Sequence, residues 1–160
     1  LSNWVMLSID DEKVFVSKDF VSIKYKLKSA VSFKESDSSS SSDSGNGSMV
    51  SYAMQFLGNR YVWGGTSLTN GTDCSGFTMG IYRHFGISIP RTSAAQASAS
   101  RSVKSSEVRP GDLFFYGSGH VSHVAMYIGG GKIIHASNAR DGIKISNAYY
   151  RKPLKIGRFS

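Results

Sequence analysis

The sequence predicts an α+β fold in which helices pack on one face of an antiparallel sheet. After residue 48 the segments with helical spacing come first and the strand-like segments follow, an order typical of α+β domains. Two short apolar runs rich in β-branched residues are joined by Gly129–Gly131, which is a hairpin signal and indicates antiparallel pairing. These two features predict a helical layer against a sheet of consecutive strands.

Strands are also expected near the N-terminus, at Trp4–Ile9 and Val14–Leu27, where Val, Ile, Phe and Tyr are frequent. Residues 36–48 hold eight serines in thirteen residues and no apolar side chain. This composition predicts a flexible linker that spans about 20 Å as a random coil. The chain therefore divides into an N-terminal segment, residues 1–35, the linker, and a larger domain, residues 49–160.

Three helices are expected in the larger domain. The first runs from Met49 to about Leu57, with Ser48 as its cap, and the second from Cys74 to Phe85, where Gly86 stops it. A short third helix runs from Ser93 to about Ser100, capped by Thr92 or Ser93. Five strands follow, at Asp112–Tyr116, His123–Ile128, Lys132–Ser137, Ile143–Ser146 and Leu154–Phe159.

Cys74 is the only cysteine of the sequence, and it stands at the predicted start of the second helix. Unpaired backbone N–H groups and the positive end of the helix dipole favour the thiolate at such a position. A lone cysteine is more often buried and inert, but this position favours a nucleophile instead. A single cysteine also excludes an internal disulfide, so the stability of the domain must come from its core.

Two of the four histidines, His123 and His135, lie on the strands of the predicted Gly129–Gly131 hairpin. With a three-residue loop, Ala125 faces His135, and His123 then lies diagonal to His135 on the same face of the sheet. One histidine can orient the other while that other accepts the cysteine proton. A one-residue bulge would place the two on opposite faces.

Four motifs occur in order along the chain: YVWGG…TDCSGF (Tyr61–Phe77), IPRTSAAQ (Ile89–Gln96), RPGDLFFY (Arg109–Tyr116) and SHVAMYIGGGKIIHAS (Ser122–Ser137). In this combination the chain resembles the NlpC-type family of papain-like cysteine endopeptidases, which cut bacterial peptidoglycan stem peptides. The resemblance covers roughly Met49 to the C-terminus. It implies a papain-like fold, with Cys74 as the nucleophile, His123 as the general base and His135 as the orienting residue.

The resemblance also implies three substrate-contacting residues. Tyr61 matches the family tyrosine that assists at the oxyanion or the substrate, and Asp73 and Ser75 match positions that line the substrate pocket. Asp73 is expected to receive the free amino group of a stem's N-terminal L-alanine, and it also suits the role of a helix cap. Trp63, in the same loop, is expected to be a core aromatic residue.

A cysteine with two histidines can also hold zinc. Structural zinc sites usually show closely spaced ligand pairs. Here the cysteine stands alone, His123 and His135 are twelve residues apart, and the sequence offers no evident fourth ligand. We therefore expect no metal and no other cofactor.

Charge is distributed unevenly along the chain. Residues 1–48 carry six lysines and seven acidic residues, a net charge of −1, whereas residues 49–160 carry thirteen basic and four acidic residues, a net charge of +9. A basic domain suits a polyanionic partner such as the bacterial cell wall. Nucleic acid is a poorer fit because the basic residues are scattered and no nucleic-acid motif is present. A surface that is basic for solubility is the simpler alternative.

The N-terminal pattern WVMLSIDDEKVFVSKDFVSIKYKL resembles the C-terminal half of a bacterial SH3-like barrel, a frequent wall-targeting partner of these peptidases. One or two isolated hairpins are marginally stable in water. This segment therefore packs on the larger domain, pairs with another chain, or comes from a barrel that was cut. The chain begins without methionine, which places an expected export signal upstream. No run of eighteen apolar residues predicts a membrane span.

These features together predict a secreted cysteine endopeptidase of the bacterial cell wall that acts on peptidoglycan stem peptides. By the resemblance, the bond cleaved joins D-γ-glutamate to the diamino acid, through thiolate attack and an acyl-enzyme. Two alternatives stay open. One is another amidase or an acyltransferase on the same scaffold. The other is a catalytically silent wall-binding module, which would need none of the Cys/His/His set.

Overall fold

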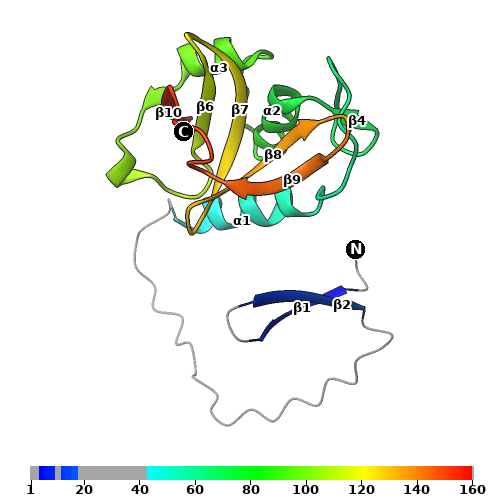
Figure 1. Ribbon diagram of the computed structural model, residues 1–160. Coiled ribbons are helices and arrows are strands. Elements are labelled where there is room, and N and C mark those ends of the chain that lie inside the picture. The colour runs from blue at the N-terminus through cyan, green and yellow to red at the C-terminus, as the bar shows by residue number, and fades with distance from the viewer. Residues whose placement is uncertain (1–3, 10–11, 18–42, 160) are drawn as a thin grey trace. The chain divides into compact units, whose positions relative to one another are not determined.

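The computed structural model describes residues 4–9, 12–17 and 43–159 (Figure 1). These residues belong to two compact units, residues 1–39 and 40–160. Each unit has its own sheet, and the second unit also holds the helices. None of the described helices is long and apolar enough to cross a membrane.

The first unit contains a hairpin of β1 (Trp4–Ile9) and β2 (Glu12–Ser17), which pair as antiparallel strands. The bounds of β1 are those predicted. β2 begins two residues before the predicted Val14, and the rest of that predicted strand, as far as Leu27, lies outside the described residues. The likeness of residues 1–35 to half of an SH3-like barrel stays a prediction.

The second unit opens with α1 (Asp43–Met54), which begins six residues before the predicted start. Ser48 therefore lies inside the helix and not at its cap. The first six residues of α1 fall in the predicted linker, whose remaining residues, 36–42, lie outside the described part of the chain. The glycines and asparagine of this stretch are poor helix formers, which explains the later predicted start. Met49 and Ala53 are buried, and such packing, more than propensity, stabilises a helix.

The end of α1 is tighter than predicted. The helix stops at Met54, and single turns then carry the chain to Gly58, which has a φ of 82°. The Gly58 N–H donates to the carbonyl of Ile143 at 2.8 Å. This bond attaches the turn to β9 (Gly142–Asn147), an edge strand of the main sheet. The predicted helix as far as Leu57 is therefore three residues too long.

The two remaining helices agree closely with prediction. α2 (Cys74–His84) begins at the predicted residue and has Phe85 as its C-cap. α3 (Ser93–Ala99) is capped by Thr92, whose side chain accepts a hydrogen bond from the Ala95 N–H at 3.2 Å. Of the two candidate caps of α3, the structure selects Thr92.

The second unit is built around a six-stranded antiparallel sheet with the order β5-β10-β6-β7-β8-β9. Its strands are β5 (Arg101–Ser102), β6 (Leu113–Ser118), β7 (His120–Gly129), β8 (Lys132–Asn138), β9 (Gly142–Asn147) and β10 (Lys155–Arg158). The five predicted strands are all present. Four short elements were not predicted, because two or three residues give no sequence pattern. They are β5, the paired strands β3 (Thr66–Ser67) and β4 (Gly71–Thr72), and the single 3₁₀ turn η2 (Ser105–Glu107).

Up to Tyr127 the hairpin of β7 and β8 has the predicted register, but at the turn Gly129 pairs with Lys132, so the loop is two residues long and not the predicted three. Met126 lies opposite Ile134 and Tyr127 opposite Ile133, so one more step places Ala125 opposite His135. The register shifts after Tyr127, next to the turn, where all three glycines of Gly129–Gly131 have positive φ angles. Because this irregularity lies between Tyr127 and the turn, it leaves both histidines on one face.

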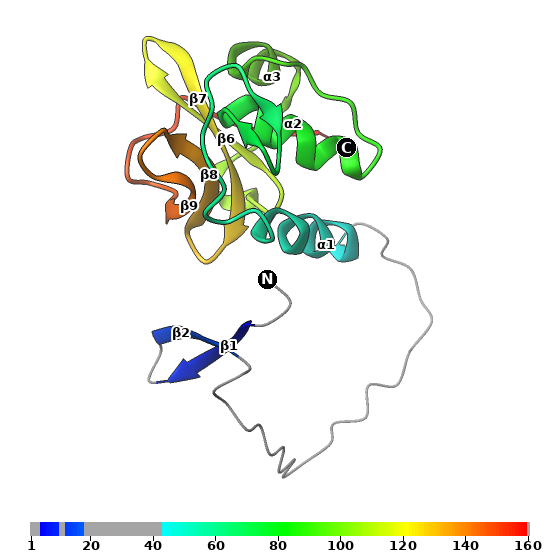
Figure 2. The same ribbon diagram turned by 90° about the vertical axis from the view of Figure 1, so that its right-hand side faces the viewer.

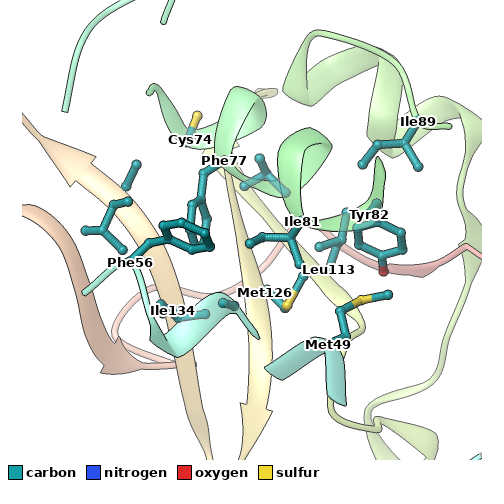
Figure 3. Packing of buried hydrophobic residues seen from close by; sticks show 14 of the residues in the cluster. Met49, Phe56, Cys74, Phe77, Ile81, Tyr82, Ile89, Leu113, Met126 and Ile134 are labelled. Carbon is teal, nitrogen blue, oxygen red and sulfur yellow. The ribbon is translucent and has the colours of Figure 1, made fainter. Parts of the chain in front are cut away.

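The helices cover one face of the sheet, as predicted (Figure 2). A buried core on that face joins side chains of α1, α2 and the central strands, among them Phe77, Ile81, Val124 and Met126 (Figure 3). The opposite face has a second, smaller cluster covered by loop residues, which includes Phe114 and Tyr116. β6 feeds alternate residues into the two clusters, and this explains why LFFY is apolar without a break.

Candidate active site

The loop before α2 and the first turn of that helix place Cys74 at the rim of the core. Figure 3 shows its sulfur directed away from Phe77. Gly76, in the first turn, lies so close to the loop that a Cβ there would collide with the backbone carbonyl of Gly65 and the hydroxyl of Thr72. The glycine-rich spacing around the cysteine therefore serves a close approach of backbone to helix.

Asp73 is the N-cap of α2, and both of its carboxylate oxygens are engaged. Oδ1 accepts from the Gly76 N–H at 2.7 Å and from Arg91 Nη1 at 2.9 Å. Oδ2 accepts from Arg91 Nη2 at 2.6 Å and from the Gly64 N–H at 3.0 Å. Arg91 Nη1 also donates to Ser75 Oγ at 2.9 Å. Burial alone would raise the pKa of Asp73, but the hydrogen bonds from Arg91 and from these two N–H groups lower it below its ordinary value.

These contacts change the reading of Asp73. The expectation that it receives a substrate amine treated it as a lone carboxylate in a basic domain, but Arg91 already neutralises it. The side chain of Asp73 is 10% exposed and already paired with Arg91, and its contact with a substrate amine stays a prediction. In this structure Asp73 caps α2 through the Gly76 N–H. Its carboxylate is also paired with Arg91, which lies 18 residues further along the chain.

Cys74 is 8% exposed, and its thiol lies near the backbone of Val124 in β7. Burial raises its pKa, and the negative charge of Asp73 adds to this effect; backbone hydrogen bonding from Val124 and Ser75 acts in the opposite direction. Burial therefore opposes the predicted preference for the thiolate, and a neighbouring base would favour loss of the thiol proton.

The two predicted histidines lie on the neighbouring strands β7 and β8. Val124, which approaches the sulfur, follows His123 directly in β7. His123 Nε2 and His135 Nδ1 are 2.7 Å apart, and His135 Nε2 lies 3.0 Å from Ser146 Oγ on β9. The structure thus brings the two predicted histidines into contact and adds a serine to their line.

Both imidazoles are neutral at physiological pH. Burial, together with the positive charge of Arg151, lowers the pKa of His123 to about 4. Burial and the neighbouring His123 lower the pKa of His135 to about 3. A neutral imidazole can accept a proton, which a general base requires.

The hydrogen-bond line determines which nitrogen is free for this purpose. Nε2 of His123 is committed to His135, so Nδ1 is the nitrogen left for the cysteine. If Nδ1 carries the lone pair, Nε2–H donates to His135 Nδ1, and His135 then donates through Nε2–H to Ser146 Oγ. Every polar atom of the line is then satisfied, and the line stabilises His123 when it becomes an imidazolium.

Two aromatic residues flank the nucleophile from the loop before α2. Tyr61 is half-buried; burial raises its pKa, and the charges of Cys74 and Asp73 raise it further, so its phenol lies within electrostatic reach of the thiol. Trp63 is 86% exposed, so the expectation of a core aromatic at this position is wrong.

Two contributors, Arg91 and Ser146, were missed by the sequence reasoning. Arg91 lies in the IPRTSAAQ motif, and an arginine directly after the motif proline was the available signal. Ser146 had no signal, because its contact with His135 depends on strand register. Gln96 is fully buried and joins α3 to the first turn of α2 through a hydrogen bond from its Nε2 to the Ser75 carbonyl at 3.0 Å.

Metal binding has little support in the geometry. In the part of the chain that the structure describes, no three side chains of His, Cys, Asp or Glu come together as a metal site. His135 uses both ring nitrogens for His123 and Ser146, which leaves neither free for an ion.

Comparison with known proteins assigns the family. The sequence model of the NlpC/P60 family matches residues 58–156, which is more than half of the chain. The chain belongs to the NlpC/P60 family. This confirms the predicted membership of a peptidase family and the α+β, papain-like fold of the larger domain; the matched NlpC/P60 residues do not include the N-terminal segment.

Relatives within the NlpC/P60 family carry peptidase names. A probable endopeptidase p60 of Listeria innocua is 43% identical over 103 residues, which cover 63% of this chain and 21% of the relative. A gamma-D-glutamyl-L-lysine dipeptidyl-peptidase of Bacillus cereus is 44% identical over 101 residues, 61% of this chain and 30% of the relative. The crystal structure of the NlpC/p60 domain of the peptidoglycan hydrolase SagA is 34% identical, with a TM-score of 0.65 over 71% of this chain and 98% of that domain.

The chain spans about a fifth to a third of the length of those two curated relatives. The SagA domain, in contrast, is matched almost from end to end. The similarity is therefore between the larger domain of this chain and the NlpC/P60 domains of these proteins.

Proposed function

We propose that this chain is a cysteine peptidase that hydrolyses peptidoglycan stem peptides, at the bond between D-γ-glutamate and the diamino acid. The observation that carries the proposal is the contact between His123 and His135 at 2.7 Å, on the strand that also touches the sulfur of Cys74. Membership of the NlpC/P60 family supports the reaction class. The name of the Bacillus cereus relative, a gamma-D-glutamyl-L-lysine dipeptidyl-peptidase, supports the bond.

In the proposed mechanism, the neutral His123 takes the proton of the Cys74 thiol through Nδ1 as the sulfur attacks the amide carbon. A C–S bond forms and the carbonyl oxygen becomes an oxyanion. The proton on His123 then passes to the departing amine, the C–N bond breaks, and a thioester remains on Cys74. Water, deprotonated by the same imidazole, hydrolyses the thioester and restores the thiol.

His135 and Ser146 act through His123. They hold its ring with Nδ1 toward the cysteine and stabilise the imidazolium, as the third member of a nucleophile–base–orienter set does. For the oxyanion we assign the backbone N–H of Cys74, at the start of α2, together with the phenol of Tyr61. Asp73 and Ser75, bound by Arg91, shape the acyl side of the site.

We further propose that the protein works outside the cell, at the bacterial wall. The net charge of +9 on residues 49–160 suits a wall rich in carboxylates and phosphates. The likeness to a domain of a peptidoglycan hydrolase supports the same location.

The test is mass spectrometry of purified wall peptides after incubation with the protein. Hydrolysis adds one water per cleaved bond and releases a dipeptide ending in D-glutamate together with a new amino terminus on the diamino acid. Cys74→Ala should release nothing, whereas His84→Gln, a change outside the site, should behave as wild type. Acyl-transfer products without added water would favour an acyltransferase. Unchanged wall that still retains the protein would favour a binding module and contradict the proposal.

A further inference from the structure

A polar cavity of about 320 Å³ opens beside the histidine pair, on the side of the sheet edge formed by β8 and β9. It lies between the two histidines and the loop that follows β9. Its lining residues are His123, His135, Ser137, Lys144, Ser146, Tyr150 and Arg151. The mechanism above uses the histidines and Ser146, and it leaves the other four residues without a role.

The chemistry of the leaving group assigns a position to this cavity. The imidazole of His123 must deliver its proton to the departing amine, so that amine and the residue carrying it lie against His123. We place the acyl half near Tyr61 and Arg91, which interact electrostatically with Cys74 and do not line the cavity. Because the cavity begins at His123, it is the space that the residue on the amine side of the scissile bond enters.

Tyr150 connects the cavity to the nucleophile. Its ring packs against Tyr116 at 5.2 Å and against His135 at 6.2 Å between centroids, and half of its surface is exposed. Burial raises the pKa of Tyr150, and the thiolate form of Cys74 would add to this effect, so the phenol is within electrostatic reach of the sulfur. A group bound between Tyr150 and the histidines is therefore next to the reacting bond.

The charges in the cavity have one sign. Lys144 and Arg151 line it, and among the described residues no acidic side chain does. Lys144 donates to Asp141 at 2.7 Å, outside the lining, so its charge is partly balanced. Arg151 is exposed, and its charge is felt by the ring of His123. The hydroxyls of Ser137 and Tyr150 add further hydrogen-bond donors beside these cations.

From this arrangement we infer that the cavity is the subsite for the leaving diamino acid and that it selects one whose side chain ends in a carboxylate. Such a diamino acid, of the diaminopimelate type, presents two carboxylates, whereas lysine presents a single carboxylate and a bare ammonium. Arg151 binds the additional carboxylate as a forked donor, and the lysine ammonium meets only like charge there. This inference rests on the proposed function, because it takes His123 as the proton donor.

Three stem tripeptides that differ at one group test the subsite. All have the sequence L-Ala-γ-D-Glu-X, in which X is meso-diaminopimelate, meso-diaminopimelate with its side-chain carboxylate amidated, or L-lysine. The amide keeps the size and removes the charge. We expect kcat/KM for the free carboxylate to exceed the other two by about tenfold, the effect of a charged hydrogen bond at a partly exposed site.

Two variants test whether Arg151 causes the preference for the free-carboxylate peptide. Arg151→Gln should reduce the preference to about twofold or less, because cleavage of the free-carboxylate peptide slows while the lysine peptide is cut at least as fast as by wild type. Lys152→Gln removes a neighbouring exposed charge that does not line the cavity, and it should keep the full preference. A lower KM, with kcat little changed, is the expected form of the wild-type advantage.

The contrary results are distinct. Equal cleavage of the three peptides by wild type would overturn the subsite and leave the proposed function intact. An equal loss on all three in Arg151→Gln would also overturn it, because Arg151 would then serve the reaction in general. If none of the peptides is cut, the proposed function fails, and the inference fails with it.

Discussion

The proposed role of Cys74 as nucleophile depends on a general base, and the loss of His123 should affect activity differently from the loss of His135. His123→Ala should lower kcat/KM about 10³-fold, because it removes proton transfer in the attack. His135→Gln should keep a measurable part of the activity, since an amide oxygen still accepts the Nε2–H of His123. The double change should be little worse than His123→Ala alone, because residues that act as a unit are non-additive. Steady-state kinetics on a stem tripeptide, with folding checked by circular dichroism, decides this.

The same pair makes a prediction about pH. The inactivation rate with iodoacetamide, a reagent that does not titrate, should hold its plateau as pH falls until it reaches the pKa of His123, about 4. Below that value the base is protonated and the cysteine keeps its proton. Arg151→Gln should shift this fall in the inactivation rate to higher pH, because the positive charge of Arg151 lowers the pKa of His123. A fall centred near pH 6.5, the ordinary histidine value, in both proteins would contradict the neutral resting pair.

Arg91 holds the acyl side together, and lysine should not replace it. Its fork reaches both oxygens of Asp73 and the hydroxyl of Ser75, which a single ammonium cannot do. Arg91→Met should cost about 1–3 kcal/mol of folding free energy, less than a fully buried pair because a third of the Arg91 side chain is exposed. Denaturant unfolding of Arg91→Met, Asp73→Asn and the double variant measures the coupling. Purely additive losses would mean that the pair contributes nothing to the cap of α2.

At the scale of the elements, the close approach of α2 to its preceding loop should be intolerant of one methyl group. Ala is normally preferred over Gly inside a helix by about 1 kcal/mol. At Gly76, however, the added Cβ meets backbone, and we expect a net loss of about 1–3 kcal/mol together with a loss of activity as the loop moves. Gly80 on the same helix is the matched control, because its Cβ would meet the flexible end of Leu68. Thermal unfolding that lowers the Tm equally for Gly76→Ala and Gly80→Ala would contradict this.

Elements that follow from local pattern were predictable, and those that depend on contact were not. The hairpin register could be read because three glycines permit one turn and the apolar alternation requires one face. The start of α1 could not, since its first residues are poor helix formers and buried Met49 anchors the helix further along. For the same reason the sequence placed Cys74 and both histidines in the site but not Arg91 or Ser146. Their partners lie 18 and 11 residues away, at distances that only the folded chain defines.

At the scale of the whole molecule, two buried neutral histidines make the free energy of unfolding depend on pH. In the unfolded chain histidine takes a proton near pH 6.5, whereas in the fold burial holds the pKa of His123 at about 4 and that of His135 at about 3. The unfolded state therefore binds more protons between these values, and stability must fall as pH decreases from 6.5 toward 4. Each histidine can contribute up to about 1.4 kcal/mol per pH unit in this window.

The measurement is urea unfolding at a series of pH values from 7 to 4.5, in wild type and in His135→Gln. Wild type should lose stability steadily over this range, and above about pH 5 the loss comes from the histidines, because few carboxylates of the unfolded chain take up protons there. His135→Gln, which has one buried imidazole fewer, should lose it with about half the slope. A wild-type protein whose stability is flat across the window would mean that the histidines accept protons in the fold. Water would then have to reach the line from His123 to Ser146, and the neutral base assigned to the mechanism would be lost with it.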